Sequence, residues 1–247
     1  MDRLVMERKS SSRPVRSSSE TSSAGGRRPD PQLAAHVRGL LGDAGTIMAI
    51  GDATYVPTDR EVTVLPAIGG GSRDPLVLPL SLTDASVDAA FVAFPRGEGE
   101  ELDAALREIR RVTRARIVLL TWDPLELTRS WLAAYAPELM EVVIRATPSV
   151  ERLVQALGAD VLVEEASLSG DAVDGTFIEA ALARPERLLE SAFRAGHPGW
   201  SCLPKSVIRR FTQELAGDLR SGAWDRYHGH LRALPTIPTA LRVIVSL

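Results

Sequence analysis

Short apolar runs alternate with helix-like segments along most of this chain, and this alternation restricts the fold more than any other feature. Thr46–Ile50, Val87–Phe94 and Arg116–Thr121 are runs of the kind found in buried strands, because they are almost continuously apolar. Glu98–Arg114 lies between two of them and carries apolar residues at helical spacing. Strands that alternate with helices predict a doubly wound, mostly parallel α/β sheet with helices on both faces.

The segment Thr46–Ala67 lies where such a sheet would hold a cofactor. It is typical of a strand (Thr46–Ile50), a polar loop and a second strand (Glu61–Leu65), and ligands bind at the carboxyl ends of such strands. In nucleotide-type sites a glycine-rich first loop admits the ligand, and an acid ending the second strand holds the ribose. Here the loop begins at Gly51 with a single glycine, and the second strand ends in Leu65. The frame of a cofactor site is present, but its contact residues are missing.

Composition excludes several classes of protein. The 247 residues suffice for one large α/β domain, and the net charge of −3 gives no indication of a nucleic-acid or membrane partner. Cys202 is the one cysteine, which excludes an internal disulfide and a cysteine-based zinc cluster. No apolar run reaches the roughly 18 residues that a membrane span needs. We expect a cytoplasmic protein with a small-molecule ligand.

Residues 1–29 differ in composition from the rest of the chain. Eight serines and seven arginines or lysines face three acids and few apolar residues, so this segment cannot bury enough surface to offset the entropy of ordering. We expect a disordered basic tail, with an organellar transit peptide or a nucleic-acid arm as the alternative. The folded domain is predicted to span residues 30–247.

Polar and aromatic side chains near the predicted strand ends are the candidates for chemistry. Asp123 directly follows the strand Arg116–Thr121, so it is the best candidate for a catalytic residue. The aromatic residues Tyr55, Trp122, Trp131 and Tyr135 are candidates for a substrate pocket, although aromatic residues at such places are more often part of the core.

Histidines near the C-terminus do not indicate a metal site. His228 and His230 are two positions apart, whereas the two histidines of a helical zinc site are four apart. The segment Trp224–His228 is interpreted as a packed helix corner, and no metal is predicted.

Five stretches of the chain, in order, resemble bacterial class I S-adenosylmethionine (SAM)-dependent methyltransferases that act on small molecules. They are LPLSLTDASVDAAF (78–91), LDAALREIRRVTRARIVLLTWDP (102–124), WLAAYAPEL (131–139), ARPERLLESAFRAG (183–196) and LPKSVIRRFTQELAGDLRSGAWDRYHGHLRAL (203–234). The resemblance covers the chain from about residue 33 onward. It implies the seven-stranded, Rossmann-like methyltransferase sheet, with its final strand inserted antiparallel.

The chain departs from this family where SAM would bind. The family's first loop resembles G-x-G-x-G. Here Gly51 remains and Asp52 follows it, and the loop, which also contains Thr54, is about two residues shorter than the family's. The family's ribose-binding acid is matched by Leu65. A histidine-containing segment after the fourth strand is replaced by residues 95–98. These positions mark a degenerate SAM site, at which we expect no cofactor.

The resemblance and the departures leave three functions open. The first is a pocket protein or SAM-independent enzyme of bacterial specialised metabolism, which would make the chain a pseudoenzyme with respect to SAM. The second is an active small-molecule methyltransferase that uses SAM through an atypical loop. The third is a non-catalytic subunit that associates with itself or regulates an active homologue. Whether the chain is an enzyme is left open by its sequence.

Overall fold

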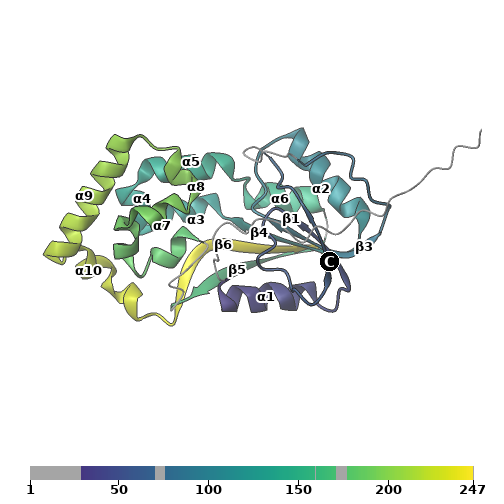
Figure 1. Ribbon diagram of the computed structural model, residues 1–247, viewed down its shortest axis with the longest axis horizontal. Helices are drawn as coiled ribbons and strands as arrows, with labels where there is room; N and C mark the ends of the chain where they lie inside the picture. The colour runs from purple at the N-terminus through teal and green to yellow at the C-terminus, as the bar shows by residue number, and fades with distance from the viewer. Residues whose placement is uncertain (1–28, 70–75, 159, 171–176, 247) are drawn as a thin grey trace, which may run out of the picture.

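A computed structural model describes residues 29–69, 76–158, 160–170 and 177–246. A sheet with helices on both faces forms one end of the molecule, and a lobe of helices forms the other (Figure 1). The predicted tail lies, up to residue 28, outside the described residues.

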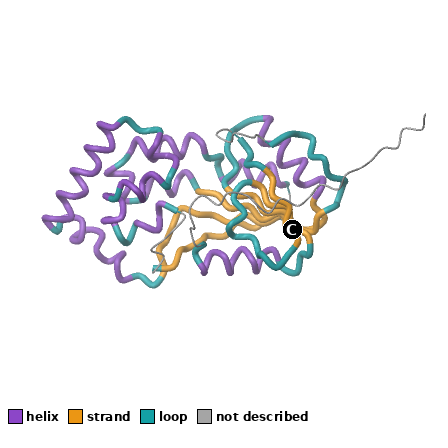
Figure 2. The backbone as a smooth tube through the Cα atoms, in the orientation of Figure 1, coloured by secondary structure: helices purple, strands orange, loops and turns teal. Residues whose placement is uncertain are grey.

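A single sheet organises the fold (Figure 2). In the described residues it has six strands in the order β2-β1-β3-β4-β6-β5. The strands are β1 (Thr46–Ile50), β2 (Glu61–Leu65), β3 (Val87–Ala93), β4 (Thr113–Trp122), β5 (Val161–Ser169) and β6 (Thr236–Ser246). Strands β1 to β4 are parallel, and β6 runs antiparallel to both of its neighbours, β4 and β5. The predicted doubly wound, mostly parallel sheet is confirmed, as is the antiparallel final strand.

The seventh strand that the resemblance implies is not found in the described residues. The apolar run Leu76–Leu80, whose composition suits a short strand or an extended segment, forms an irregular segment held by the helix α2 (Glu100–Val112). The Leu80 amide donates to the Glu108 carboxylate at 2.9 Å, and Arg111 Nη2 donates to the Leu80 carbonyl at 3.2 Å. These helix side chains satisfy backbone groups that a strand would use, so β2 is the edge of the described sheet.

The connection between β1 and β2 is unusually short. Parallel strands are usually joined by a crossover of a dozen or more residues that contains a helix. Here residues 51–60 are all described and form turns without a helix. Tyr55 and Val56 of this connection are buried against the sheet, where a crossover helix would otherwise lie.

Helices cover both faces of the sheet because successive strand residues point to opposite sides. The helix α1 (Pro31–Leu41) packs on one face, and α2 and α6 (Val150–Leu157) pack on the other. Asp30 fixes the start of α1: one carboxylate oxygen accepts from the Leu33 amide and the other from the Ser169 amide, both at 2.9 Å. This buried cap therefore ties α1 to the end of β5.

The lobe at the other end of the molecule has its own apolar core, centred on Trp224 and Phe211. Its helices are α3 (Pro124–Arg129), α4 (Trp131–Tyr135), α5 (Pro137–Ala146), α7 (Ser191–Ala195), α8 (Pro198–Ser201), α9 (Lys205–Ser221) and α10 (Ala223–His228), with 3₁₀ turns η1 (Ile178–Ala181), η2 (Pro185–Leu189) and η3 (Gly229–Ala233). No helix in the described part of the chain is long and apolar enough to cross a membrane.

The apolar spacing of the sequence predicts one helix near 125–135 and a long helix near 176–195; the first is present but divided, and the second is wrong. The helix expected near 125–135 is divided at Ser130, whose side chain accepts from the Leu132 amide and so starts α4 anew. The long helix expected near 176–195 is replaced, within the described residues, by η1, η2 and the five-residue α7. Pro185 has no amide hydrogen to continue a helix, which accounts for the break at that point.

Candidate functional site

The carboxyl ends of β1, β2 and β3 are fastened to one another by the loops that follow them. The Gly51 amide donates to the Leu65 carbonyl at 3.0 Å, and the Arg96 amide donates to the Ile68 carbonyl at 3.1 Å. Gly51 has φ +84°, and a Cβ at this position would lie 2.9 Å from the Ala93 carbonyl oxygen. Glycine is needed here because the loop packs against the end of β3.

The other predicted cofactor contacts are accounted for locally. The Asp52 carboxylate accepts from the Thr54 amide at 2.9 Å and from the Thr54 hydroxyl, which closes an exposed turn. Leu65 is half-buried and packs against the apolar core on the α2 face. No contact in the described residues directs Asp52 or Thr54 toward the space beyond the strand ends.

The arrangement of these loops bears on whether SAM fits. A bound SAM needs an acceptor for its ribose hydroxyls and space between the loops that follow β1 and β3. Within the described residues β2 ends in Leu65 rather than in an acid, and Gly51 packs directly against Ala93. In these two respects the described residues differ from the SAM sites usual in sheets of this type.

Four aromatic rings gather beside these strand ends. Phe94 follows β3 with φ +48°, a conformation uncommon for a bulky residue, and its ring lies 4.2 Å from that of Trp122, centroid to centroid. Phe177 lies 5.4 Å from Phe94 and stacks on Tyr55 at 5.7 Å. Tyr55 and Phe177 are buried, whereas Phe94 and Trp122 are half-buried. We call these four residues the aromatic cluster.

Glu179 lies near Trp122 of the aromatic cluster and is a buried acid in the described structure. It is 3% exposed, and neither carboxylate oxygen has a hydrogen-bond partner of good geometry. Burial raises its pKa to about 7, against weaker opposing effects of its own backbone amide and of the Trp122 indole. The Trp122 Nε1 is also buried without a partner of good geometry. Buried carboxylates are normally paired, and a strongly perturbed one marks a candidate functional site.

Asp123, the predicted catalytic residue, has a structural task in this arrangement. Its carboxylate accepts from the Leu125 amide at 2.9 Å and so caps α3. Its other oxygen lies 3.5 Å from Nη2 of the buried Arg242. These contacts explain its position after β4 without chemistry, and a catalytic role for Asp123 stays a prediction.

The four predicted pocket aromatics divide between two places. Tyr55 and Trp122 belong to the aromatic cluster, whereas Trp131 and Tyr135 lie in the helical lobe. Trp131 Nε1 donates to the Leu182 carbonyl at 3.1 Å. The Tyr135 hydroxyl donates to Asp218 at 2.7 Å, and burial together with this bond raises the Tyr135 pKa. The structure thus brings Tyr55 and Trp122 together, and a role of any of the four residues in a substrate pocket stays a prediction.

The sequence interpretation missed Phe94, Phe177 and Glu179. A signal was present for Glu179, because it is the one charged residue in the apolar run Phe177–Ala183. An isolated acid in such a run is either exposed on a surface or buried for a reason. No local signal could have placed Phe94 against Trp122, because these residues come from different strands.

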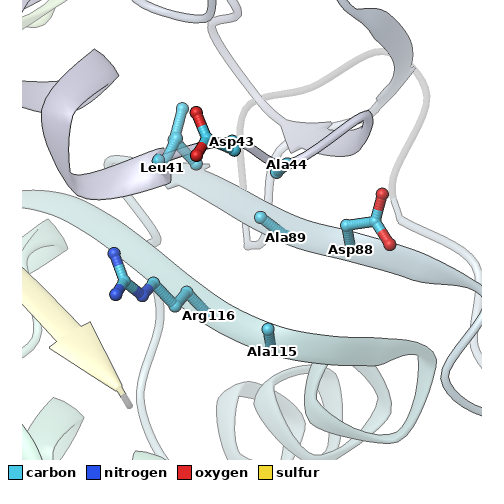
Figure 3. Close-up of a pocket in the computed structure, with 8 residues that line it drawn as sticks. Leu41, Asp43, Ala44, Asp88, Ala89, Ala115 and Arg116 are labelled. Atoms are coloured by element: carbon cyan, nitrogen blue, oxygen red, sulfur yellow. The ribbon is translucent and has the colours of Figure 1, made fainter.

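A separate hollow of about 260 Å³ lies at the opposite, amino-terminal edge of the sheet (Figure 3). It is lined in part by Asp43, Asp88 and Arg116. Asp88 accepts from the Thr46 amide and hydroxyl, both at 2.9 Å, and these bonds lower its pKa. Arg116 Nη1 donates to the Leu40 carbonyl at 3.1 Å, at the C-terminus of α1. Asp88 and Arg116 are thus occupied in joining strands and helix.

Metal ligands do not gather elsewhere in the described residues. No group of three or more histidine, cysteine, aspartate or glutamate side chains among them could hold a metal ion. His228 lies 5.9 Å from Trp131 and 5.6 Å from Trp224, ring to ring, and burial lowers its pKa. This segment is the packed helix corner that the sequence predicts.

Comparison with known proteins supports the fold. No protein-family model and no curated protein matches the chain. A solved structure from Anabaena variabilis, named as a methyltransferase of an antibiotic biosynthesis pathway, is 26% identical, with a TM-score of 0.74. The match covers 90% of this chain and 98% of that one. The class I methyltransferase fold, and with it the predicted resemblance to SAM-dependent methyltransferases, is confirmed.

Two more distant structures are also similar. The [4+2]-cyclase SpnF is 14% identical over 86% of this chain and 79% of its own, with a TM-score of 0.43. A SAM-dependent methyltransferase of Thermotoga maritima is 14% identical over 89% of each chain, with a TM-score of 0.41. At these scores the two structures add nothing on function.

Proposed function

We propose that this chain is an enzyme of the methyltransferase fold that acts on a small molecule beside the aromatic cluster, with Glu179 as its proton-accepting group. The observation that carries this proposal is the buried Glu179 carboxylate, which among the described residues has no hydrogen-bond partner of good geometry and lies near Trp122 at the end of β4. A carboxylate with a pKa near 7 is half-protonated near neutral pH, which suits a general base or acid. Apolar rings around it favour a largely apolar substrate.

One version of this proposal is SAM-dependent methyl transfer. It is supported by the likeness to the Anabaena protein, which extends over nearly the whole of both chains. Glu179 would then accept the proton that a hydroxyl or amine substrate loses. This version requires the loop of residues 51–60 to move away from Ala93, because the two are in contact in the present arrangement.

The other version is a reaction or a binding step without SAM. It is supported by Leu65 at the end of β2 and by the direct packing of Gly51 on Ala93. A ribose whose hydroxyls meet Leu65 loses hydrogen bonds worth about 2–3 kcal/mol, or roughly two decades of affinity. From this packing we expect a SAM dissociation constant above about 1 mM, equivalent to −4 kcal/mol or weaker.

Isothermal titration with SAM and S-adenosylhomocysteine separates the two versions. Micromolar affinity for either compound would overturn the SAM-independent version and establish the methyltransferase version, which a methyl-transfer assay would then confirm. The variant L65D is a useful addition: it restores the acid but not the loop, so it should remain without measurable SAM binding.

Screening for the substrate tests the role of Glu179 in both versions. A library of small apolar metabolites is screened by thermal shift, and any ligand found is followed for turnover. E179Q should abolish turnover while retaining the fold, and E165Q is the matched control, because the Glu165 side chain is 85% exposed on the neighbouring strand β5. Unchanged turnover in E179Q would overturn the proposal.

A non-catalytic role is the remaining proposal, with a homologous methyltransferase or a second copy of this chain as its partner. The open edge of β2 is the feature that favours it, because an unpaired edge strand can add a strand from another chain. This role would apply if no ligand and no turnover were found. Sedimentation of the purified chain, alone and mixed with a homologous methyltransferase encoded beside it, would test it.

A further inference from the structure

Among the residues that the structure describes, the Glu179 carboxylate has no positively charged partner. The elements that pack against η1 are β5, β6 and η2, and their charged side chains are engaged elsewhere. The contacts in question are Glu164 with His36 at 2.9 Å, Arg242 with Asp123 at 3.5 Å and with Glu165 at 3.9 Å, Glu186 with Arg232 at 2.6 Å, and Arg187 with Glu190 at 3.6 Å. None of these groups is among the influences on the Glu179 pKa. An ionised carboxylate in this place is therefore uncompensated by the described protein.

Among the described residues, no guanidinium group is found over a ring of the aromatic cluster either. In the described residues the guanidinium groups that lie over aromatic rings belong to other places: Arg187 over Phe193, Arg194 over Trp200 and Arg232 over Trp224. Trp122, Phe94 and Phe177 have centroids within 4.2 to 6.5 Å of one another, so their rings form one aromatic surface, and its Trp122 indole interacts with the Glu179 carboxylate. Such surfaces attract cations, most strongly where water is excluded.

From this combination we propose that the site of Glu179 and the aromatic cluster binds a small organic cation, a protonated or quaternary amine. This inference rests on the proposed function and names the substrate class of the same site. The cation supplies the missing charge for the carboxylate, and its methyl or methylene groups pack on Trp122 and Phe94. These two rings are half-buried, so they form the side from which a ligand reaches the carboxylate.

The same chemistry disfavours two other ligand classes. An anionic ligand would be repelled by the carboxylate, with no cationic side chain of the neighbouring elements free to attract it. A divalent metal ion needs several oxygen or nitrogen ligands, and Glu179 is not part of any metal-binding group in the described residues. A cation held by one carboxylate and several rings is the class that remains.

Paired ligands of equal shape and different charge test this inference. Tetramethylammonium, choline and benzyltrimethylammonium are titrated calorimetrically at pH 8 beside neutral carbon isosteres such as 3,3-dimethylbutan-1-ol. We expect at least one cation to bind ten-fold or more tightly than its isostere. E179Q should reduce this preference to three-fold or less, W122F should weaken the cation only in part, and E165Q should change neither.

Proton release gives an independent readout. A quaternary cation carries no proton, so at pH 6 its binding should expel one from Glu179, and the heat of binding should depend on the ionisation enthalpy of the buffer. This dependence should vanish in E179Q, whose fold is checked by circular dichroism.

The outcomes separate this inference from the proposed function. Equal binding of cations and isosteres, or binding of neutral ligands alone, overturns the cation inference and leaves Glu179 as a candidate acid or base for a neutral substrate. No binding of any cation up to 50 mM (roughly the limit at which such affinities are meaningful) also overturns it. Loss of turnover in E179Q with a neutral substrate would sustain only the proposed function.

Discussion

The strand-end site, with Glu179 and the aromatic cluster, and the aromatic residues of the helical lobe differ in the hydrogen bonding of their polar atoms. In the helical lobe, Trp131 donates to the Leu182 carbonyl and Tyr135 donates to Asp218, so the polar atoms of these two side chains have partners. Beside the strand ends, the Trp122 indole and the Glu179 carboxylate have none of good geometry in the described structure. Similar residue types therefore serve different ends: the lobe is packed for stability, whereas the strand-end site keeps groups that a ligand can use.

The comparison has two exceptions, which set its limits. In the lobe, Trp200 Nε1 and Trp224 Nε1 are also buried without a partner of good geometry. An unpaired neutral N–H costs about 1–3 kcal/mol, which the burial of a whole indole ring offsets. An unpaired carboxylate is more costly, because the charge itself must leave water. The charge on Glu179, rather than the lack of a hydrogen bond alone, is what distinguishes the strand-end site.

The largest effect is expected in the lobe. Trp224 is fully buried, with Trp131 at 5.4 Å and the Arg232 guanidinium at 4.8 Å from its ring. Trp224→Ala should lower the free energy of unfolding by about 3–5 kcal/mol, measured by urea denaturation. Tyr227→Ala is the control: this neighbouring ring is 70% exposed and should matter by less than about 0.5 kcal/mol. Equal effects of the two changes would contradict the packed corner.

Replacing Glu179 at the strand-end site should stabilise the protein at pH 8, whereas replacing Trp224 in the lobe should destabilise it. The Glu179 pKa of about 7 in the folded chain exceeds the ordinary 4.5, so the folded chain binds the proton more tightly than the unfolded one. Stability should therefore fall as pH rises from 4.5 to 7, by at most about 3 kcal/mol. Glu179→Gln should remove this decline and stabilise the protein at pH 8, as followed by denaturation across pH. A destabilised variant at pH 8 would mean that the carboxylate has a partner.

A smaller effect is expected at the end of β1. Gly51→Ala forces a Cβ to within 2.9 Å of the Ala93 carbonyl, whereas Gly97 shares a positive φ, +93°, and has open space around it. Gly97→Ala measures the cost of the backbone conformation alone, about 1 kcal/mol. We expect Gly51→Ala to cost about 1–2 kcal/mol more, by thermal and urea unfolding. Equal costs would show that the loop is free to move from Ala93, as SAM binding requires.

The smallest effect is expected for a satisfied polar group in the lobe. Tyr135→Phe removes the 2.7 Å bond to Asp218, but both groups retain some contact with water. The cost should be about 1 kcal/mol, since a partly exposed acceptor regains a water partner. A change of several kcal/mol would show that Tyr135 belongs to a buried network and would weaken the contrast between the two clusters.

The sequence by itself determined the class of fold and parts of its detail. The apolar runs predicted β1 and β2 with their observed ends, and α2 within two residues at either end, because the spacing of apolar side chains along a strand or helix is a local property. The same local view found Leu65 where a ribose-binding acid would stand. It could not foresee that Leu76–Leu80 would be held by Glu108 and Arg111 of α2, since those contacts join segments distant in the chain.

The tertiary structure alone decided where the site lies. In the sequence Glu179 is marked only as the one charged residue of an apolar run, and the packing of η1 against β5 and β6 is what removes it from water and raises its pKa. The tertiary structure also places Trp131 and Tyr135 in the helical lobe and Tyr55 and Trp122 in the aromatic cluster, although the sequence interpretation had grouped all four. Burial and partner choice depend on residues far apart in the chain, so periodicity could predict the sheet but not which of its neighbours would be left unpaired.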